Sequence, residues 1–587
     1  MKLIFHSMGK YKWAIFFAIF LKLVGTLTEL VLPYILEHMV DYVVPAGKLG
    51  PVIFWGLMMF VAAFFCRQFN VMANRRAINN AHKVSYDIRQ ALFEKTANLS
   101  GTQFDGFGLP SLISRMTSDS YNVQTAAQQL QSLCVRAPIM LVGGVIATLS
   151  MDKHLALILV IMIPFLLGII LFVSAKGIPM FSKVQQKLDV VVRIMRENIT
   201  GIRVVKALSK SDYEMRRYAV ANKEMADSDI KASTIMSIPW PFMQLCLNTG
   251  LALVIIIGAR RVNAGQMEPG VILAFLTYFN MITMGVMGLN RIFMSMSRAS
   301  ASANRIDAVL KTETDQNILS EDQVKKPEGD ELIRFEHVDF SYHEKQEGTQ
   351  VEGFAGEEQE NALTDIDFAL KKGESLGIIG PTGCGKTTII NLLMRFYDAS
   401  EGAIYVEGRD VRTYDKDELR RKFGVVFQND MIFKDTLNEN IDFGRGLSAE
   451  DIRAAVEDAQ VADYIDGLDE GLQYEASIKG ANLSGGQKQR LLVARALAGD
   501  PEILILDDSS SALDYKTDAA MRKAIGEHHK DSTLIMIAQR VSSIMGMTHI
   551  MVMDNGRCIG YGSHEELLKT CPEYKDIYDV QMGSIGA

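Results

Sequence analysis

The sequence is short of paired cysteines and of positive charge. Its six cysteines are scattered over 587 residues with no C-x-x-C pair, so neither a disulfide framework nor a zinc site is supported. Lys and Arg number 61 against 69 Asp and Glu, and the net charge of −8 argues against a nucleic-acid partner. Long apolar runs are missing after about residue 300. The N-terminal and C-terminal halves of the chain are therefore expected to be different kinds of domain.

Six long apolar stretches occupy the N-terminal half. Most are near the length that a helix needs to cross the ~30 Å hydrocarbon core of a bilayer. No small-residue cleavage pattern follows the first stretch, so we expect an uncleaved membrane helix and not a signal peptide. The stretches are residues 13–34, 51–71, 133–149, 155–173, 241–257 and 271–293.

Two long connections between these stretches are rich in Lys and Arg, for example Arg75 and Arg193. The positive-inside rule places them in the cytosol. They have few Gly or Pro breaks and carry helical periodicity, so the membrane helices should continue far into the cytosol and turn near residues 104–110 and 209–214. The sequence therefore predicts an all-α transmembrane domain of six membrane helices with long cytosolic helix extensions, over residues 1–310, in the cytoplasmic (inner) membrane.

The pattern changes after this domain. Residues 311–330 are polar and charged, and predict a linker. Short strands alternate with helices over residues 331–587, which is typical of an α/β domain. An acidic insertion at residues 343–361 is expected as a loop within a β-hairpin, and Ser563 with Glu566 predicts a capping box at a helix start. The expected fold class is thus a multidomain membrane protein with an α/β P-loop domain after the six helices.

One glycine-rich stretch matches the phosphate-binding pattern G-x-x-x-x-G-K-[ST] between an expected strand and an expected helix. Its glycines let backbone N–H groups converge on phosphate oxygens, and the helix start adds a partial positive charge. Lys386 can reach the β- and γ-phosphates, and the Thr387 hydroxyl can bind Mg²⁺. The stretch predicts nucleotide binding. It comprises Gly380, Pro381, Thr382, Gly383, Cys384, Gly385, Lys386, Thr387 and Thr388.

Two further motifs accompany this loop. The apolar run Ile503–Asp507 ends in a carboxylate that can hold Mg²⁺ directly or through water. A serine and two glycines open a strong helix and form a second phosphate cradle. One chain thus carries two half-sites for one kind of ligand, which a head-to-tail dimer would join. The cradle comprises Leu483, Ser484, Gly485, Gly486 and Gln487.

With these motifs, nearly the whole chain resembles an ATP-binding cassette (ABC) exporter of the half-transporter kind. Residues 380–388 match Walker A, Ile503–Asp507 match Walker B, and residues 483–487 match the family signature in full. The resemblance implies ATP and Mg²⁺ as cofactors. It also implies that the signature of each chain completes the ATP site of its partner.

The resemblance implies roles for single residues as well. Tyr342 falls where the family stacks an aromatic ring on adenine. Gln428 matches the glutamine that senses Mg²⁺ and couples to the membrane helices, so the implied metal set is Thr387, Gln428 and Asp507. Asp514 ends the run Ser-Ala-Leu-Asp, which matches the loop that crosses the dimer interface.

Two catalytic positions depart from the family pattern. Asp508 stands where the family usually has a glutamate that polarises the attacking water. Gln539 stands at the switch histidine, and an amide can bind a phosphate but cannot carry a proton. A misplaced general base costs roughly 10²–10⁴ in rate. Lys479, before the signature, replaces a usual acid. Each change alone fits drift in an active enzyme; together they resemble the degenerate chain of a heterodimeric, multidrug-type exporter.

Three residues of the apolar stretches are candidates for the cargo path. Glu29 lies ~24 Å along the first helix, where an acid is a functional candidate by default. The alternative is that it reaches the outer headgroups. Met281 and Met284 follow helical spacing and could adapt to varied apolar cargo, or serve ordinary helix packing.

The sequence therefore predicts ATP-driven export of amphipathic or hydrophobic compounds such as drugs, lipids or peptides. The predicted partner is a second ABC half-transporter, and one ATP site of the pair is degenerate. Hydrolysis at this chain's own Walker site should be poor. Two alternatives stay open: a homodimeric exporter with slow ATPase, and a non-transporting ATP-gated regulator or channel on the same scaffold.

Overall fold

The computed structural model of the chain divides into two compact units. The first comprises Met1–Asn98 and Gly108–Thr312, and the second comprises Leu99–Phe107 and Glu313–Ala587. The structure describes residues 1–325, 329, 331–342, 361–509 and 512–583. The insertion predicted at residues 343–361 lies outside the described residues except for Asn361.

The first unit consists of helices. In the part of the chain that the structure describes, six helices are long and apolar enough to cross a membrane, as the sequence predicts. All three tryptophans of the chain, Trp13, Trp55 and Trp240, fall in this unit. Its helices are α1 (Lys2–Gly9), α2 (Lys12–His38), η1 (Met39–Val43), α3 (Leu49–Ala97), α5 (Leu109–Ser114), η2 (Arg115–Asp119), α6 (Ser120–Gln131), α7 (Leu133–Met151), α8 (Lys153–Thr200), α9 (Ile202–Ala207), α10 (Ser211–Ser237), α11 (Pro239–Asn263) and α12 (Pro269–Leu310).

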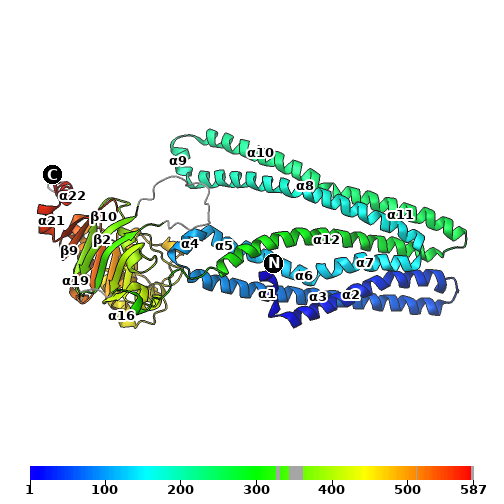
Figure 1. Ribbon diagram of the computed structural model, residues 1–587, viewed down its shortest axis with the longest axis horizontal. Helices are drawn as coiled ribbons and strands as arrows, with labels where there is room; N and C mark the ends of the chain where they lie inside the picture. Colours follow the sequence, from blue (N-terminus) through cyan, green and yellow to red (C-terminus); the bar gives the residue numbers. More distant parts are fainter. Residues whose placement is uncertain (326–328, 330, 343–360, 510–511, 584–587) are drawn as a thin grey trace. The chain divides into compact units, whose positions relative to one another are not determined.

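Several of these helices are longer than a bilayer requires. The 49 residues of α3 extend ~74 Å at a rise of ~1.5 Å per residue, against ~30 Å of hydrocarbon. Helices α8 and α10 lie side by side and are joined by the short α9 (Figure 1). The corner predicted near residues 209–214 thus begins earlier, at Gly201, because a separate helical turn is inserted there. The corner predicted near residues 104–110 contains α4 (Gly101–Phe107).

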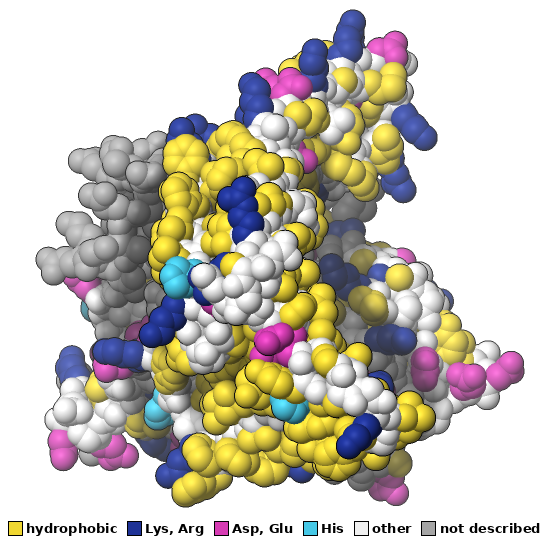
Figure 2. Space-filling view, turned by 90° about the vertical axis from the view of Figure 1, so that its right-hand side faces the viewer, with side chains coloured by type: hydrophobic (Ala, Val, Ile, Leu, Met, Phe, Trp, Pro, Cys, Tyr) yellow, Lys and Arg dark blue, Asp and Glu magenta, His cyan; other side chains and the backbone are white. Residues whose placement is uncertain are grey.

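The surface of the first unit is strongly apolar. Phe16, Phe60 and Phe64 are each more than half exposed, at 63%, 69% and 58%. Apolar side chains cover much of the face drawn in Figure 2, with charged side chains scattered between them. A soluble surface rarely exposes so much contiguous apolar area, so this surface fits a lipid environment.

The second unit is built on two sheets. An antiparallel sheet has the strand order β2-β1-β4-β5, and a six-stranded sheet has the order β10-β9-β3-β8-β7-β6. The strands are β1 (Ile333–Phe340), β2 (Leu363–Leu370), β3 (Ser375–Ile379), β4 (Glu401–Val406), β5 (Arg409–Asp410), β6 (Phe423–Val426), β7 (Ile503–Asp507), β8 (Thr533–Ile537), β9 (His549–Asp554) and β10 (Arg557–Gly562).

Helices and short helical turns surround these sheets. Ser563 and Glu566 form the predicted capping box at the start of α21. The helical segments are α4 (Gly101–Phe107), η3 (Glu321–Gln323), α13 (Lys386–Leu393), η4 (Val411–Thr413), α14 (Lys416–Arg420), α15 (Leu437–Asp442), α16 (Ala449–Asp458), α17 (Ala462–Asp466), η5 (Gly471–Gln473), η6 (Ile478–Gly480), α18 (Gly485–Leu497), α19 (Tyr515–His528), α20 (Val541–Ile544), α21 (His564–Thr570) and α22 (Pro572–Gly583).

The parallel part of the larger sheet positions the functional loops. Strands β3, β8, β7 and β6 are neighbours in this order and run parallel. Strand β7 is buried at every position, which explains its unbroken apolar sequence. Because the carboxyl ends of parallel strands meet at one edge, the loops that follow these four strands converge there.

Candidate functional site

A cavity of about 760 Å³ lies at this edge of the sheet. Its size is within the range of ligand pockets, roughly 300–1,000 Å³. It brings together the glycine-rich loop after β3, Gln428 after β6, Asp507 and Asp508 at the end of β7, and Gln539 after β8. It is lined by Tyr342, Ala362, Ile379, Gly380, Pro381, Thr382, Gly383, Gly385, Lys386, Thr387, Thr388, Gln428, Asp507, Asp508, Ile537, Gln539, Ile577 and Gln581.

The glycine-rich loop has the shape of a phosphate cradle. Gly385 caps α13 with a left-handed φ of 96°, and a Cβ there would lie 2.6 Å from Leu363 and 2.7 Å from the Ala362 carbonyl oxygen. Only glycine satisfies both demands. Lys386 Nζ donates to the Gly380 and Pro381 carbonyl oxygens at 2.9 and 2.7 Å, which holds the charge over the loop. Cys384 is buried, with 4% exposed, and is not among the residues that line the cavity.

The predicted Mg²⁺ ligands meet beside this loop. Thr387 Oγ1 donates to Asp507 Oδ2 at 2.7 Å, and Gln428 lines the same cavity. Burial raises the pKa of the Asp507 carboxyl, and the hydrogen bond from Thr387 opposes that rise. No group of three or more His, Cys, Asp or Glu among the described residues could hold a metal. A hydroxyl, an amide oxygen and a single carboxylate suit Mg²⁺, which takes further ligands from water and phosphate.

The two unusual residues contact each other. Gln539 Nε2 donates to Asp508 Oδ2 at 3.0 Å, and both line the cavity. Burial raises the pKa of Asp508 above its usual value. The Gln539 hydrogen bond and the charges of Lys386 and Arg540 offset only part of that rise. One carboxylate oxygen is therefore engaged by an amide that cannot relay a proton.

Tyr342 lies at the rim of the cavity, with 40% of the side chain exposed. Its hydroxyl is 3.0 Å from Thr388 Oγ1. Its ring meets the Phe340 and Tyr397 rings edge-on, with centroids 4.8 and 5.2 Å away. These contacts hold a partly exposed aromatic ring next to the phosphate cradle, as a stacking role on adenine requires.

The signature lies elsewhere in the second unit. Ser484 is the N-cap of α18, and its hydroxyl oxygen accepts from the Gln487 N–H at 3.3 Å. Gln487 Oε1 in turn accepts from the Ser484 N–H at 2.7 Å. None of residues 483–487 lines the 760 Å³ cavity among the described residues. Ser484 and Gly485 are exposed, so this helix start is accessible to an anionic ligand.

Asp514 has a local structural role in this chain. It caps α19, and its carboxylate accepts from the Thr517 N–H at 3.0 Å. Backbone hydrogen bonds, that of Thr517 first, lower its pKa. The residue three positions earlier in the predicted interface loop, Ser511, lies outside the described residues. The interface role of Asp514 stays a prediction.

Sequence reasoning missed the contribution of α22 to the cavity. Ile577 and Gln581 of this helix line the cavity. Gln581 Nε2 donates to the Gln539 carbonyl oxygen at 2.9 Å, and its Oε1 accepts from the Val541 N–H at 2.8 Å. Gln581 therefore bridges the backbone on both sides of Arg540. The only signal in the sequence is an amphipathic helix near the C-terminus, which carries no motif.

The first unit contains a smaller cavity, of about 90 Å³. It brings together all three residues predicted for the cargo path, Glu29, Met281 and Met284. Glu29 Oε1 accepts from Arg136 Nη2 of α7 at 2.8 Å. Arg136 was not predicted, because it lies at the start of an apolar stretch and has no pattern around it. The cavity thus places an ion pair beside methionines among the helices of the first unit.

Two family descriptions match the chain. They read "ABC transporter transmembrane region" over residues 15–286 and "ABC transporter" over residues 363–511. The chain is 32% identical over 571 residues to YfiB of Bacillus subtilis, an uncharacterized ABC transporter ATP-binding protein, with 97% of this chain and 96% of the relative covered. The chain belongs to the ABC transporter family.

Two further comparisons describe this transporter. It is 31% identical to an ATP-dependent lipid A-core flippase of Methylobacillus flagellatus, over 85% of this chain and 83% of that protein. It shares its fold with a bacterial Atm1-family ABC exporter solved with ATP bound, at a TM-score of 0.80 and 23% identity, over 97% and 99% of the two chains. The transporter is thus a multi-pass membrane protein with its ATP-binding domain in the cytosol, and ATP hydrolysis in this family is coupled to transport.

Proposed function

We propose that this chain is one subunit of a heterodimeric exporter that has one degenerate and one consensus ATP site. The chain's own Walker motifs form the degenerate site, which binds ATP with Mg²⁺ and hydrolyses it poorly. Its signature completes the consensus site of the partner. A homodimer with slow ATPase and an ATP-gated regulator or channel are the competing functions.

The contact between Asp508 and Gln539 carries this proposal. The carboxylate at the position of the base is one methylene short, and the amide at the switch position holds it by a 3.0 Å hydrogen bond. The signature cradle keeps its cap, and its Ser484 and Gly485 are exposed. The catalytic positions of the chain's own half-site are altered, while the signature that would serve a partner is intact. This combination supports a pair of different chains in which only the partner's ATP site hydrolyses efficiently.

The chain purified alone should bind ATP–Mg²⁺ and hydrolyse it at least ~10²-fold more slowly than an ABC exporter with the usual glutamate and histidine, because a positioned base is missing. Steady-state ATPase and binding of a fluorescent ATP analogue should be measured on one preparation. Lys386→Ala, which removes the charge over the phosphate loop, is the control for specific binding. A turnover of several per second would favour the homodimer.

The cavity beside Glu29 supports an amphipathic cargo. It offers both charges of the Glu29–Arg136 pair and the flexible apolar side chains of Met140, Met281 and Met284. We propose drugs, lipids or peptides as the cargo class. The name of the related lipid A-core flippase supports lipids within this class.

Replacing Glu29 with glutamine should lower transport of an amphipathic probe ~10-fold, because Arg136 then loses its charged partner beside the cargo. Uptake of a fluorescent cationic dye and flipping of a fluorescent phospholipid should be followed in inverted vesicles that contain the assembled transporter. Asp307→Asn removes an exposed ion pair with Lys311 in the same unit and should transport normally. Equal rates for Glu29→Gln and Asp307→Asn with both probes would remove Glu29 from the cargo path.

A further inference from the structure

The beginning of the chain is strongly basic, although the chain as a whole carries a net charge of −8. Residues 1–28 contain four lysines and no Asp or Glu. Residues 72–90 of α3 contain four Lys and Arg and one acid, Asp87. Because α1 and α2 pack against α3, these two basic segments lie side by side (Figure 1). Together they form a local excess of positive charge next to the first apolar stretch.

Tyr11 joins the two segments. Its hydroxyl donates to Asp87 Oδ2 of α3 at 2.9 Å, and Lys10 Nζ donates to the same oxygen at 2.9 Å. Lys10 Nζ and Lys83 Nζ also lie 5.5 and 5.9 Å from the centroid of the Tyr11 ring, within the range of cation–π contacts. The Asp87 charge is therefore paired with Lys10, and the charge of Lys83 lies against an aromatic ring and not against an acid.

Three exposed cations of this region have no acidic partner. Among the residues that the structure describes, Lys12, Arg76 and Lys83 form no ion pair. Arg76 instead lies over the Phe17 ring of α2, 5.8 Å from its centroid. Arg76 and Lys83 are two helical turns apart, so they lie on the same face of α3. The positive-inside rule accounts for the number of these cations, but not for their position on aromatic rings at the start of α2.

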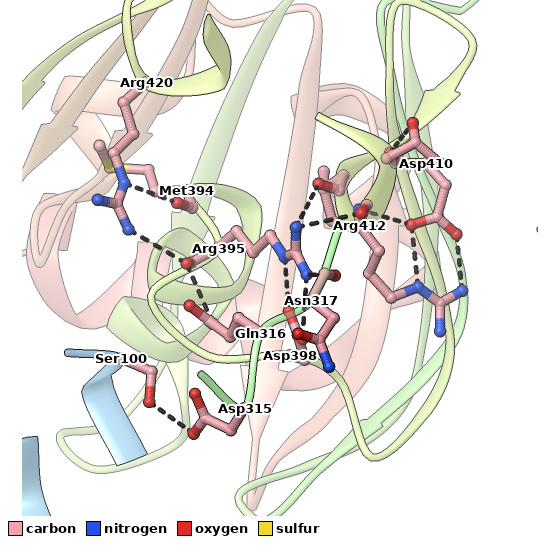
Figure 3. A network of polar contacts seen from close by, with 12 residues as sticks. Ser100, Asp315, Gln316, Asn317, Met394, Arg395, Asp398, Asp410, Arg412 and Arg420 are labelled. Carbon is pink, nitrogen blue, oxygen red and sulfur yellow. Dashed lines mark hydrogen bonds and ion pairs between the residues drawn. The ribbon is translucent and has the colours of Figure 1, made fainter. Parts of the chain in front are cut away.

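A buried arginine of the second unit shows what a fully paired cation has around it. Arg395 pairs with Asp398 at 2.9 Å and is surrounded by further oxygen acceptors (Figure 3). Cations form their strongest hydrogen bonds with anionic acceptors. The three cations beside Tyr11 have no such acceptor within the described part of the chain, so an anion from outside the chain can supply it.

An apolar surface adjoins these cations. Helix α2 begins at Lys12, and Trp13, Phe16 and Phe20 follow at helical spacing with exposed fractions of 76%, 63% and 49%. Tryptophan is enriched where a membrane meets water. The cations therefore lie at the level of the lipid headgroups, and the aromatic side chains lie at the level of the acyl chains. An anionic amphiphile fits both surfaces at once.

We propose that this region is a binding site for the phosphate headgroup of an anionic phospholipid from the cytosolic leaflet. Lys12, Arg76 and Lys83 donate to the phosphate oxygens, and the Tyr11 ring positions the ammonium groups that lie over it. We call it the Tyr11 site, and it comprises Lys10, Tyr11, Lys12, Arg76 and Lys83.

The Tyr11 site is separate from the predicted cargo path. Glu29 lies ~26 Å further along α2 than Lys12, at a rise of ~1.5 Å per residue. A lipid at the Tyr11 site is thus a resident ligand of the first unit and not the exported compound. The proposal holds whether the transporter is a heterodimer or a homodimer.

Native mass spectrometry tests the proposal on the full-length chain in detergent, with equal amounts of phosphatidylglycerol and phosphatidylcholine that carry the same acyl chains. The wild type should prefer phosphatidylglycerol ~10²-fold for the first lipid bound, because each of three cations near a headgroup contributes ~5-fold. Lys83→Gln and Arg76→Gln should each lower this preference ~5-fold, and the double variant should lower it ~25-fold.

Lys176→Gln is the matched control for the loss of one charge. Lys176 Nζ of α8 also lies over an aromatic ring at the end of an apolar stretch, 5.0 Å from the Phe172 centroid, but outside the Tyr11 site. This variant should change the preference less than ~2-fold. Tyr11→Leu keeps every charge and removes the ring, so it should lower the preference ~5-fold, whereas Tyr11→Phe keeps the ring and should stay within ~2-fold of the wild type.

A general attraction of lipid to a positive surface predicts a different pattern. Lys176→Gln would then lower the preference as much as Lys83→Gln does, and Tyr11→Leu would leave it unchanged. Either result overturns the proposal. Glycerol 3-phosphate in ~10-fold excess should not displace the lipid, because the acyl chains contribute to binding. Displacement would show that the ligand is a soluble phosphate, and would overturn the assignment to a phospholipid.

Discussion

The ATPase activity of the assembled transporter should fall at least ~10²-fold when Gly485 is replaced by aspartate. Gly485 is the first residue of α18, and in the proposed dimer its N–H meets the γ-phosphate in the partner's site. Among the residues that the structure describes, a Cβ built on Gly485 meets only Ala512 Cβ, at 3.7 Å, which is ordinary contact. The fold of this chain should therefore tolerate the change, and the loss comes from a negative charge against a phosphate.

The opposite result is expected at this chain's own half-site. Asp508→Ala should cost the ATPase of the proposed pair less than ~10-fold, because in the proposed arrangement no working base is lost there. Steady-state ATPase of the co-purified pair measures both changes, and Gly485→Ala separates the effect of charge from that of size. If Asp508→Ala silences the pair while Gly485→Asp leaves it active, the working and degenerate sites are the reverse of those proposed.

Repair of the proposed degenerate site is the second large effect. Asp508→Glu together with Gln539→His should raise hydrolysis at this site ~10²-fold, the lower end of what a positioned base contributes. The longer carboxylate reaches further toward the attacking water, and the amide that holds Asp508 at 3.0 Å is removed. A partner whose own base has been replaced with alanine isolates the repaired site in the ATPase assay.

The two single variants are the controls for the repair. Asp508→Glu alone keeps the Gln539 amide, and Gln539→His alone keeps the short carboxylate, so each should restore less than the double variant. Unchanged hydrolysis in the double variant, with an intact signature in the partner, would show that the defect lies in another residue. Gln581 is then the next candidate, because it holds the Gln539 backbone.

The sequence predicts the parts of this transporter that depend on local chemistry. Six apolar stretches of membrane length become six candidate spans, since a helix is the way for such a stretch to satisfy its backbone in lipid. The spacing of Gly380, Gly385 and Lys386 predicts the phosphate loop, because few other residues fit its backbone. The capping box at Ser563 is equally local.

Contacts between distant segments were beyond such a prediction. Arg136 meets Glu29 from a helix 107 residues away, and Gln581 meets Gln539 from 42 residues away. No sequence spacing predicts either contact, because the tertiary fold and not the local backbone brings the two residues together. The membership of α4 in the second unit is the largest example, since its sequence is continuous with the membrane helices on both sides.

The confinement of all three tryptophans to the first unit has a practical consequence. The second unit binds the nucleotide but contributes no indole, so its own rearrangements are silent in intrinsic fluorescence excited at the red edge of absorption. In the chain purified alone, any shift or quenching of emission on addition of a nucleotide must then originate around Trp13, Trp55 or Trp240. The tryptophan emission of the unmodified protein thus reports how the first unit responds to nucleotide. The measurement needs neither a label nor a known cargo.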